Sequence, residues 1–199
     1  MQQNLSELIS TRLSHDIIGN IGAVANAAEL LEEGDMDFLD DIKSILKTSS
    51  GVLTARMKFF RLAFGLNNAN LENQDILKNT AAAYLETLGS RNHCIRLEWS
   101  PIPSAYGRLA LLGVMCIADT LIRGGCISVR PYQRGIAVVH NDDAQVSAEK
   151  AAALKNVVNS GDAEDNAQFA PAAYMLSLVG ESKMNFYLVS QSGLGFVFE

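Results

Sequence analysis

The sequence has few of the features that mark secreted, membrane-spanning or metal-binding proteins. Its three cysteines (Cys94, Cys116 and Cys126) form no CxxC pair and no Cys/His metal spacing, so we expect free thiols, buried in a reducing cytosol. No run of about 18 uninterrupted apolar residues is present, which predicts no membrane span. The chain also opens without a positively charged segment or a long apolar run, so we expect no signal peptide and a cytoplasmic protein.

Positive charge is scarce as well. The chain has 16 Lys and Arg against 22 Asp and Glu, a net charge of −6 that is spread along the sequence. Binding to nucleic acid needs clustered Lys and Arg, so we expect no nucleic-acid partner. Apolar residues, by contrast, make up 48% of the 199 residues, enough for the packed core of one ordinary domain or two small ones.

Two long helical patterns open the chain. Apolar residues recur at spacings of three and four from Leu5 to about Glu33, where Gly34-Asp35 ends the pattern, and again from about Asp37 to Ala63. The short connection predicts an antiparallel helical hairpin. Because a two-helix hairpin cannot bury its apolar stripe alone, the simplest solution is a four-helix bundle with a second copy, and we predict a homodimer.

The character of the sequence changes after residues 65–70, and we place a domain boundary there, dividing the chain into residues 1–68 and 69–199. The second part is predicted to be an α+β sandwich, a sheet with helices on one face. Its expected elements, in chain order, are a helix over 75–89, a strand over 95–99, an apolar helix over 106–122, a strand pair over 126–131 and 135–140, helices over 147–158 and 171–179, and two closing strands over 185–190 and 195–198.

His15 is the main candidate for a reactive group. It stands on the first helix, off the apolar stripe at about 100° per residue, and Gly19 and Gly22 continue its face. Each glycine costs a helix about 0.8–1 kcal/mol relative to alanine, so the pair needs a reason, either docking of another protein or packing or flexing of the helix. His15 is therefore either an imidazole that a partner reaches or a surface histidine without chemistry.

The other two histidines are weaker candidates. His93 follows a loop and His140 ends a predicted strand, and neither has a Ser, Cys or carboxylate partner at a recognisable spacing. We interpret both as structural or exposed.

Three segments resemble one protein family: Leu13-Ser14-His15-Asp16 with the helix that follows it, Phe59 to Gly65, and Ala118 to Gly125. A hairpin with a helical His-Asp pair, followed by this order of helices and strands, resembles the core of histidine kinases. In detail it is more similar to the alphaproteobacterial histidine phosphotransferases of the ChpT type. The resemblance implies a dimerising hairpin joined to a degenerate ATPase-like domain. One departure is Gly19-Asn20, where the kinases usually have Ser-Pro or Thr-Pro.

The nucleotide-binding motifs of such kinases are not recognisable here. Met115, Cys116 and Ile117 stand where the resemblance places the Mg²⁺-holding Asn. The segments 140–144 and 169–173 lack the glycines that let a backbone approach phosphates closely. The later Ser192-Gly193 is interpreted as a hairpin turn. We therefore predict that the chain binds neither ATP nor another cofactor.

The resemblance implies an enzyme, a histidine phosphotransferase that relays a phosphoryl group between receiver-domain aspartates through His15. The donor would be the receiver of a hybrid histidine kinase and the acceptor a response regulator, with Mg²⁺ held by the receivers. Asp16 resembles the family's acidic residue that orients the ring or accepts a proton; the alternative is an ordinary solvated acid. An ATP-dependent kinase and a dimeric docking protein without phosphotransfer stay open as other functions.

Five further residues are predicted to contact the receiver: Arg12, Gly19, Asn20, Gly22 and Arg56. Arg12 precedes His15 by one turn, and counting outward from the turn at 34–36 places Arg56 near the level of His15 on the second helix. Either guanidinium would steady a transferring phosphoryl group or pair with the acidic receiver site. The alternative for each is a plain surface charge.

Overall fold

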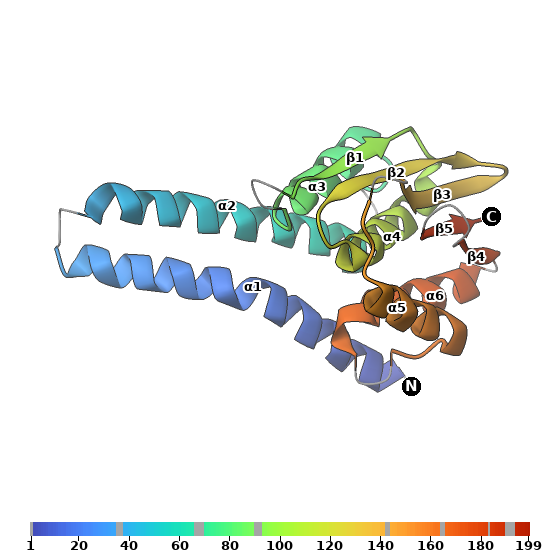
Figure 1. The fold of residues 1–199 in the computed structure, drawn as a ribbon, viewed down its shortest axis with the longest axis horizontal. Helices are drawn as coiled ribbons and strands as arrows, with labels where there is room; N and C mark the ends of the chain where they lie inside the picture. Colours follow the sequence, from blue (N-terminus) through green and yellow to red (C-terminus); the bar gives the residue numbers. More distant parts are fainter. Residues whose placement is uncertain are drawn as a thin grey trace.

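The computed structural model describes residues 2–34, 38–65, 70–89, 93–141, 144–163, 166–182, 184–189 and 194–199, with side chains from Leu5 onward. The predicted domain boundary between residues 68 and 69 and the predicted turn at 192–193 lie outside the described residues. The boundary therefore stays a prediction. Figure 1 shows the two parts of the molecule, a long helical hairpin and a compact arrangement of strands and helices at its base.

The hairpin consists of α1 (Gln2–Glu32) and α2 (Leu39–Phe64), which run side by side in opposite directions. Ala27 and Ile42 are buried on the hairpin, 1% exposed each. Several large apolar side chains stay in solvent, as a hairpin with an unpaired stripe requires: Ile18, Ile21, Leu30, Leu31, Ile45 and Met57. The predicted helical hairpin is confirmed.

The second part contains one five-stranded sheet in the order β1-β2-β3-β5-β4. Its strands are β1 (Ile95–Trp99), β2 (Gly125–Tyr132), β3 (Gly135–His140), β4 (Phe186–Val189) and β5 (Gly195–Phe198). β1 is parallel to β2, and the other neighbouring pairs are antiparallel. The two predicted hairpins, β2–β3 and β4–β5, are therefore both antiparallel pairs, with Val129 opposite Val138 in the first.

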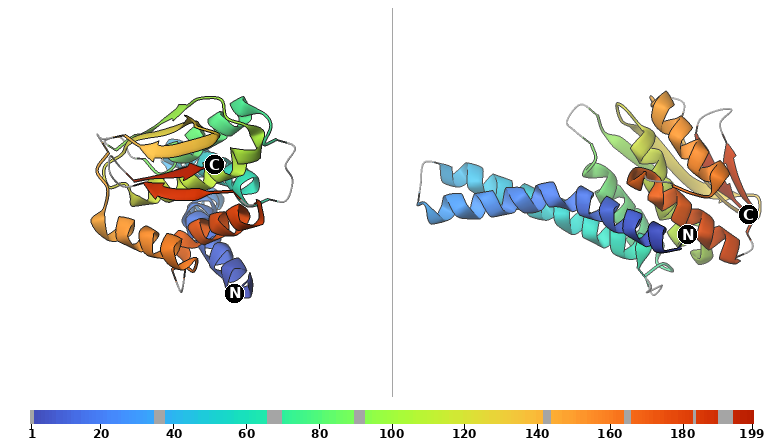
Figure 2. Two further views of the ribbon diagram at one scale, coloured as in Figure 1. Left: turned by 90° about the vertical axis from the view of Figure 1, so that its right-hand side faces the viewer. Right: turned by 90° about the horizontal axis from the view of Figure 1, so that it is seen from below.

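The helices α3 (Gln74–Glu86), α4 (Gly107–Thr120), α5 (Ala148–Ser160) and α6 (Ala170–Ser182) lie on one side of this sheet (Figure 2). Short 3₁₀ turns, η2 (Ser104–Tyr106) and η3 (Ala167–Phe169), precede α4 and α6. Local sequence sets several ends: the side chains of Asn73 and Ser147 accept hydrogen bonds from the first turns of α3 and α5. The predicted α+β fold with helices on one face is confirmed.

The base of the hairpin is fixed to the second part through a shared core. Phe59 and Phe60 of α2 are buried in the same apolar cluster as α4 and the sheet. The ring of Phe59 stacks on that of Tyr84 in α3, with ring centroids 4.0 Å apart. The rings of Phe64 and of Tyr174 in α6 have centroids 5.7 Å apart. This packing places the middle of α1, which carries His15, next to the helices of the second part.

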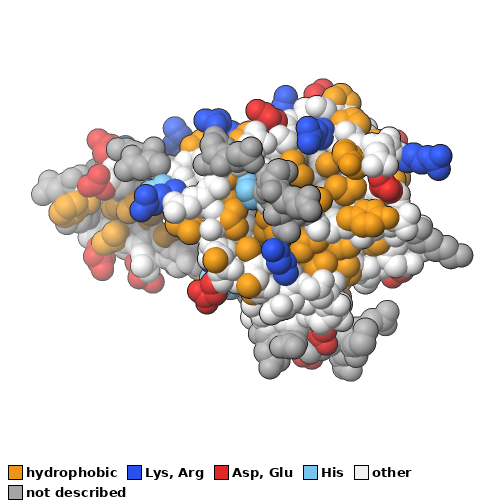
Figure 3. Space-filling model, turned by 45° about the vertical axis from the view of Figure 1, so that its right-hand side comes forward, with side chains coloured by type: hydrophobic (Ala, Val, Ile, Leu, Met, Phe, Trp, Pro, Cys, Tyr) orange, Lys and Arg blue, Asp and Glu red, His pale blue; other side chains and the backbone are white. Residues whose placement is uncertain are grey.

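The surface seen in Figure 3 mixes apolar side chains with charged ones of both signs, and the Lys and Arg side chains on this face are scattered. Among the described residues, no helix combines the length and the apolar character needed to cross a bilayer.

Candidate functional site

The imidazole of His15 projects from α1 into solvent, with 85% of its side chain exposed. Its Nδ1 faces Oδ1 of Asp16 at 3.5 Å, the outer limit for a hydrogen bond. Nε2 is thus the ring nitrogen that points away from the carboxylate. Exposure of this degree leaves the ring within reach of another protein, which is the first requirement for a group that exchanges phosphoryl with a partner.

Asp16 differs sharply from its neighbour, since only 12% of its side chain is exposed. Oδ2 of Asp16 accepts a hydrogen bond from Nε of Arg12 at 2.8 Å, while Oδ1 faces Nδ1 of His15. The hydrogen bond from Arg12 therefore holds the Asp16 carboxylate in one orientation. An ordinary solvated acid, the alternative considered from the sequence, does not describe it.

Arg12 is buried, at 7% exposure, in a network that joins the hairpin to α4 and η3. Its Nη1 donates to Oδ2 of Asp119 at 2.8 Å and to the carbonyl of Gln168 at 3.0 Å, and its Nη2 donates to Oδ1 of Asp119 at 3.0 Å. A buried, paired guanidinium is not a plain surface charge, which was the alternative for Arg12. Contact between Arg12 and a receiver stays a prediction. Helical spacing placed Arg12 near His15, but α4 and η3 cover that part of the helix.

Asp119 is the residue of this network that sequence reasoning missed. It sits in the last turn of α4, and burial raises the pKa of its carboxyl while the charge of Arg12 opposes that rise. Burial alone would lower the pKa of Arg12, but Asp119 raises it well above the ordinary value, so the guanidinium stays cationic. The available signal was an acid after the long apolar run that follows Arg108 in this helix, because a buried carboxylate needs a cationic partner.

Arg56 lies at the level of His15, as counting from the turn predicted. Nη1 of Arg56 donates to the backbone carbonyl of Asp16, and Nε and Nη2 donate to Oγ1 and the carbonyl of Thr87 at 3.2 and 3.3 Å. The half-buried guanidinium thus ties α1 to the end of α3. Contact between Arg56 and a receiver stays a prediction.

Gly19 and Gly22 are exposed on α1, and Asn20 between them is half-buried. A Cβ added at either glycine would have no neighbour within 4 Å among the described atoms. The glycines therefore serve no close packing inside the described part of this chain. Docking of a partner at Gly19, Asn20 and Gly22 stays a prediction.

The segment that the resemblance aligns with the Mg²⁺-holding Asn of kinases is part of the core. Met115, Cys116 and Ile117 are all 0% exposed, and burial raises the pKa of the Cys116 thiol. No cluster of three His, Cys, Asp or Glu side chains suited to a metal ion occurs among the residues the structure describes.

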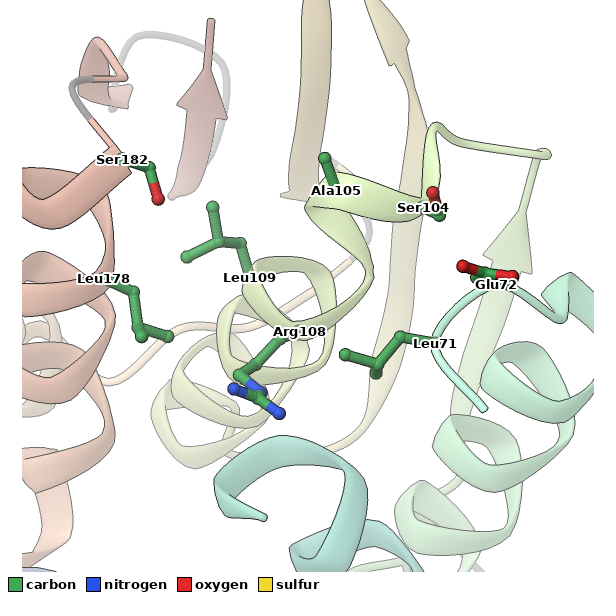
Figure 4. Close-up of a pocket in the computed structure, with 8 residues that line it drawn as sticks. All are labelled: Leu71, Glu72, Ser104, Ala105, Arg108, Leu109, Leu178 and Ser182. Atoms are coloured by element: carbon green, nitrogen blue, oxygen red, sulfur yellow. The ribbon is translucent and has the colours of Figure 1, made fainter. Parts of the chain in front are cut away.

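A separate cavity of about 370 Å³ opens near the start of α4 (Figure 4). It is lined from four segments by Leu71, Glu72, Ser104, Ala105, Arg108, Leu109, Leu178 and Ser182. Arg108 donates to the backbone carbonyls of Leu62 and Gly65 at the end of α2, so its guanidinium also holds the hairpin in place. Asp119 and the His15 network lie at the other end of α4, so the cavity is not part of the His15 site.

The chain is similar to known phosphotransferases in sequence and in fold. The chain is 33% identical over 135 residues to Protein phosphotransferase ChpT of Brucella abortus (strain 2308), a match that spans 64% of this chain and 60% of that relative. A solved structure described as a bacterial phosphotransferase superposes with a TM-score of 0.74 and 25% identity, covering 100% of this chain and 97% of that one. No family model matches the chain. The predicted similarity to ChpT is therefore confirmed in sequence over part of the chain, and the fold of the whole chain is similar to that of a bacterial phosphotransferase.

Proposed function

We propose that this protein is a histidine phosphotransferase that relays a phosphoryl group between receiver-domain aspartates through His15. The observation that carries the proposal is the exposed imidazole of His15 with one ring nitrogen turned toward a fixed carboxylate. The similarity to two proteins named phosphotransferases supports it. The partners we propose are the receiver of a hybrid histidine kinase as donor and a response regulator as acceptor, in the cytoplasm.

The geometry fits attack by Nε2. A proton on Nδ1, shared with Oδ1 of Asp16, leaves the lone pair on Nε2. The Nε2–P bond forms as the bond from phosphorus to the receiver's aspartate oxygen breaks, and that oxygen keeps the electron pair as a carboxylate. The imidazole gains positive charge in this step, and the Asp16 carboxylate stabilises that charge. The distance between Nδ1 of His15 and Oδ1 of Asp16 shortens as the charge develops. The reverse step passes the phosphoryl group to a second receiver.

We also propose that the protein works as a homodimer. Ile21 follows His15 by six residues, so it lies about 120° around the helix from it at about 100° per residue. The hairpin has an apolar face. It consists of the exposed side chains of Ile21 and Met57 and of an apolar groove of about 730 Å³, whose lining includes Leu13, Leu53 and Phe60. A second copy against this face would complete a four-helix bundle and leave His15 open to receivers.

The C-terminal part is proposed to act without nucleotide, since the residues in place of the kinase Asn are core residues. Titration with a fluorescent ATP analogue and Mg²⁺ is expected to give no saturable signal. Saturable binding would favour the kinase alternative instead.

Phosphoryl transfer from a labelled receiver tests the proposed function. A receiver domain carrying ³²P on its aspartate is mixed with the protein, with His15→Gln, and with His93→Gln as a control for histidine loss at another exposed position. Wild type and His93→Gln are expected to take up label that is stable in base and lost in acid, and His15→Gln to take up none. Labelling of His15→Gln would contradict the proposal. Absence of transfer to a folded wild-type dimer would favour a docking protein.

A further inference from the structure

We propose that Asp119 is a positioning residue for His15: acting through Arg12 and Asp16, it selects the imidazole tautomer that carries its proton on Nδ1. The inference rests on the proposed function for its consequence in phosphotransfer, but the tautomer itself is a property of the free protein. It gives the α/β part an influence on the nucleophile of the hairpin, transmitted through two side chains.

The contacts form a continuous chain from α4 to the reactive ring. Both oxygens of Asp119 accept from Arg12, at 2.8 and 3.0 Å. The Nε–H of the same guanidinium donates to Oδ2 of Asp16 at 2.8 Å. The other oxygen of Asp16 faces Nδ1 of His15 at 3.5 Å. Asp119 thus contacts Arg12 through both of its oxygens, and Asp16 contacts Arg12 with one oxygen and faces His15 with the other.

Arg12 transmits orientation because its guanidinium is planar and its donors are fixed relative to one another. The bidentate contact with Asp119 sets the plane of the group, and that plane fixes the direction of the Nε–H bond toward Asp16. The carbonyl of Gln168 takes a further hydrogen bond from Nη1. A lysine at the same position would keep the positive charge but would lose this geometry.

The position of Asp16 is fixed a second time through its backbone. Arg56 donates to the carbonyl of Asp16 while also bonding Thr87 at the end of α3. With its backbone held from one side and its carboxylate from the other, Asp16 has little freedom to turn away from His15. The direction of Oδ1 therefore depends on the partners of Arg12. In the part of the chain that the structure describes, Asp119 is the only carboxylate that pairs with Arg12 besides Asp16.

The orientation of Oδ1 matters because an imidazole has two neutral tautomers. A carboxylate beside Nδ1 favours the form with hydrogen on Nδ1 and the lone pair on Nε2, which is the nitrogen exposed to a receiver. Without the carboxylate, a solvent-exposed ring mainly carries its proton on Nε2, where no lone pair is available for attack. Asp119, acting through Arg12 and Asp16, therefore sets the fraction of His15 in the Nδ1–H tautomer, which has the lone pair on Nε2.

The tautomer is measured directly by ¹⁵N NMR of the imidazole, in protein without any receiver and at a pH where the ring is neutral. Wild type and the control Glu98→Gln, which alters a carboxylate that accepts from Ser128 on the sheet, are expected to show His15 mainly as the Nδ1–H form. Asp119→Asn and Arg12→Lys are expected to shift it toward the Nε2–H form. Arg12→Lys serves alone if Asp119→Asn does not fold. An unchanged His15 spectrum in a folded variant of either kind would overturn the inference.

Phosphotransfer then tests the consequence. Asp119→Asn is expected to slow transfer from a phosphorylated receiver by about tenfold, less than the roughly 10²–10⁴-fold contribution of a positioned acid or base, because Asp16 itself is still present. If Asp119 acts only through Asp16, the double variant Asp16→Asn/Asp119→Asn will be no slower than Asp16→Asn. Additive losses would overturn the inference while leaving the proposed function intact. Failure of wild type to accept phosphoryl would instead contradict the proposed function, and the NMR comparison would still decide the tautomer.

Discussion

At the scale of single residues, Tyr84 makes an unusual contribution to stability. Its hydroxyl is buried and has no hydrogen-bond partner among the described atoms, and burial raises the pKa of the phenol. An unpartnered buried hydroxyl costs free energy, so Tyr84→Phe is expected to leave the free energy of unfolding at pH 7 unchanged or to raise it by about 1 kcal/mol. Urea unfolding followed by circular dichroism measures this difference. A loss of more than about 1 kcal/mol would show that the hydroxyl has a partner.

The same residue predicts how stability changes at high pH. The native phenol keeps its proton where the unfolded phenol, with its ordinary pKa of 10.0, loses it. The native state then binds more protons than the unfolded state, so the free energy of unfolding falls as pH rises above about 10, by up to about 1.4 kcal/mol per pH unit for this group. Unfolding curves between pH 9 and 11 are expected to show a smaller fall in Tyr84→Phe, and equal slopes would contradict this role.

The three cysteines are expected to differ in reactivity. Cys94 is exposed, whereas Cys116 and Cys126 are buried, and burial raises the pKa of both buried thiols. Because the thiolate is the reactive form, a thiol reagent at pH 8 is expected to modify one cysteine quickly in the native protein. The other two are expected to react only after denaturant is added. Rapid reaction of more than one native thiol would contradict the described packing.

At the scale of elements, substitutions at Gly19 in α1 test helix stability and access to His15 separately. The space around Gly19 is open, so Gly19→Ala is expected to stabilise the helix by about 0.8–1 kcal/mol and to raise the melting temperature. Gly19→Gln adds a longer side chain to the face of His15 and is expected to slow phosphotransfer without lowering the melting temperature. Equal transfer rates for the two variants would show that the receiver does not approach over this face.

Features that depend on local periodicity could be predicted from the sequence, whereas the burial of Arg12, which depends on distant contacts, could not. The level of Arg56 opposite His15 follows from counting residues along two helices, and the exposed stripe follows from spacing of three and four. The burial of Arg12 depends on residues 107 and 156 positions later, Asp119 and Gln168, which α4 and η3 bring against the helix. No local pattern around Arg12 distinguishes a buried guanidinium from an exposed one.

At the scale of the whole molecule, the exposed apolar face of the hairpin predicts the state of assembly. Ile21→Glu introduces a charge into this face and is expected to convert the dimer to monomer. Ile122→Glu changes a residue that is 52% exposed at the end of α4 and serves as the matched control. Sedimentation equilibrium is expected to give a dimer for wild type and Ile122→Glu. A wild-type monomer, or an unchanged dimer in Ile21→Glu, would contradict the proposed four-helix bundle.

In the proposed phosphotransfer, His15 carries the phosphoryl group on Nε2. The most direct measurement is ³¹P and ¹⁵N NMR of the intact protein after phosphorylation by a receiver domain. We expect one phosphohistidine, with phosphorus coupled to Nε2 of His15 and the proton retained on Nδ1 beside Asp16. A phosphoryl group on Nδ1, on another residue, or on no residue of the folded protein would contradict it.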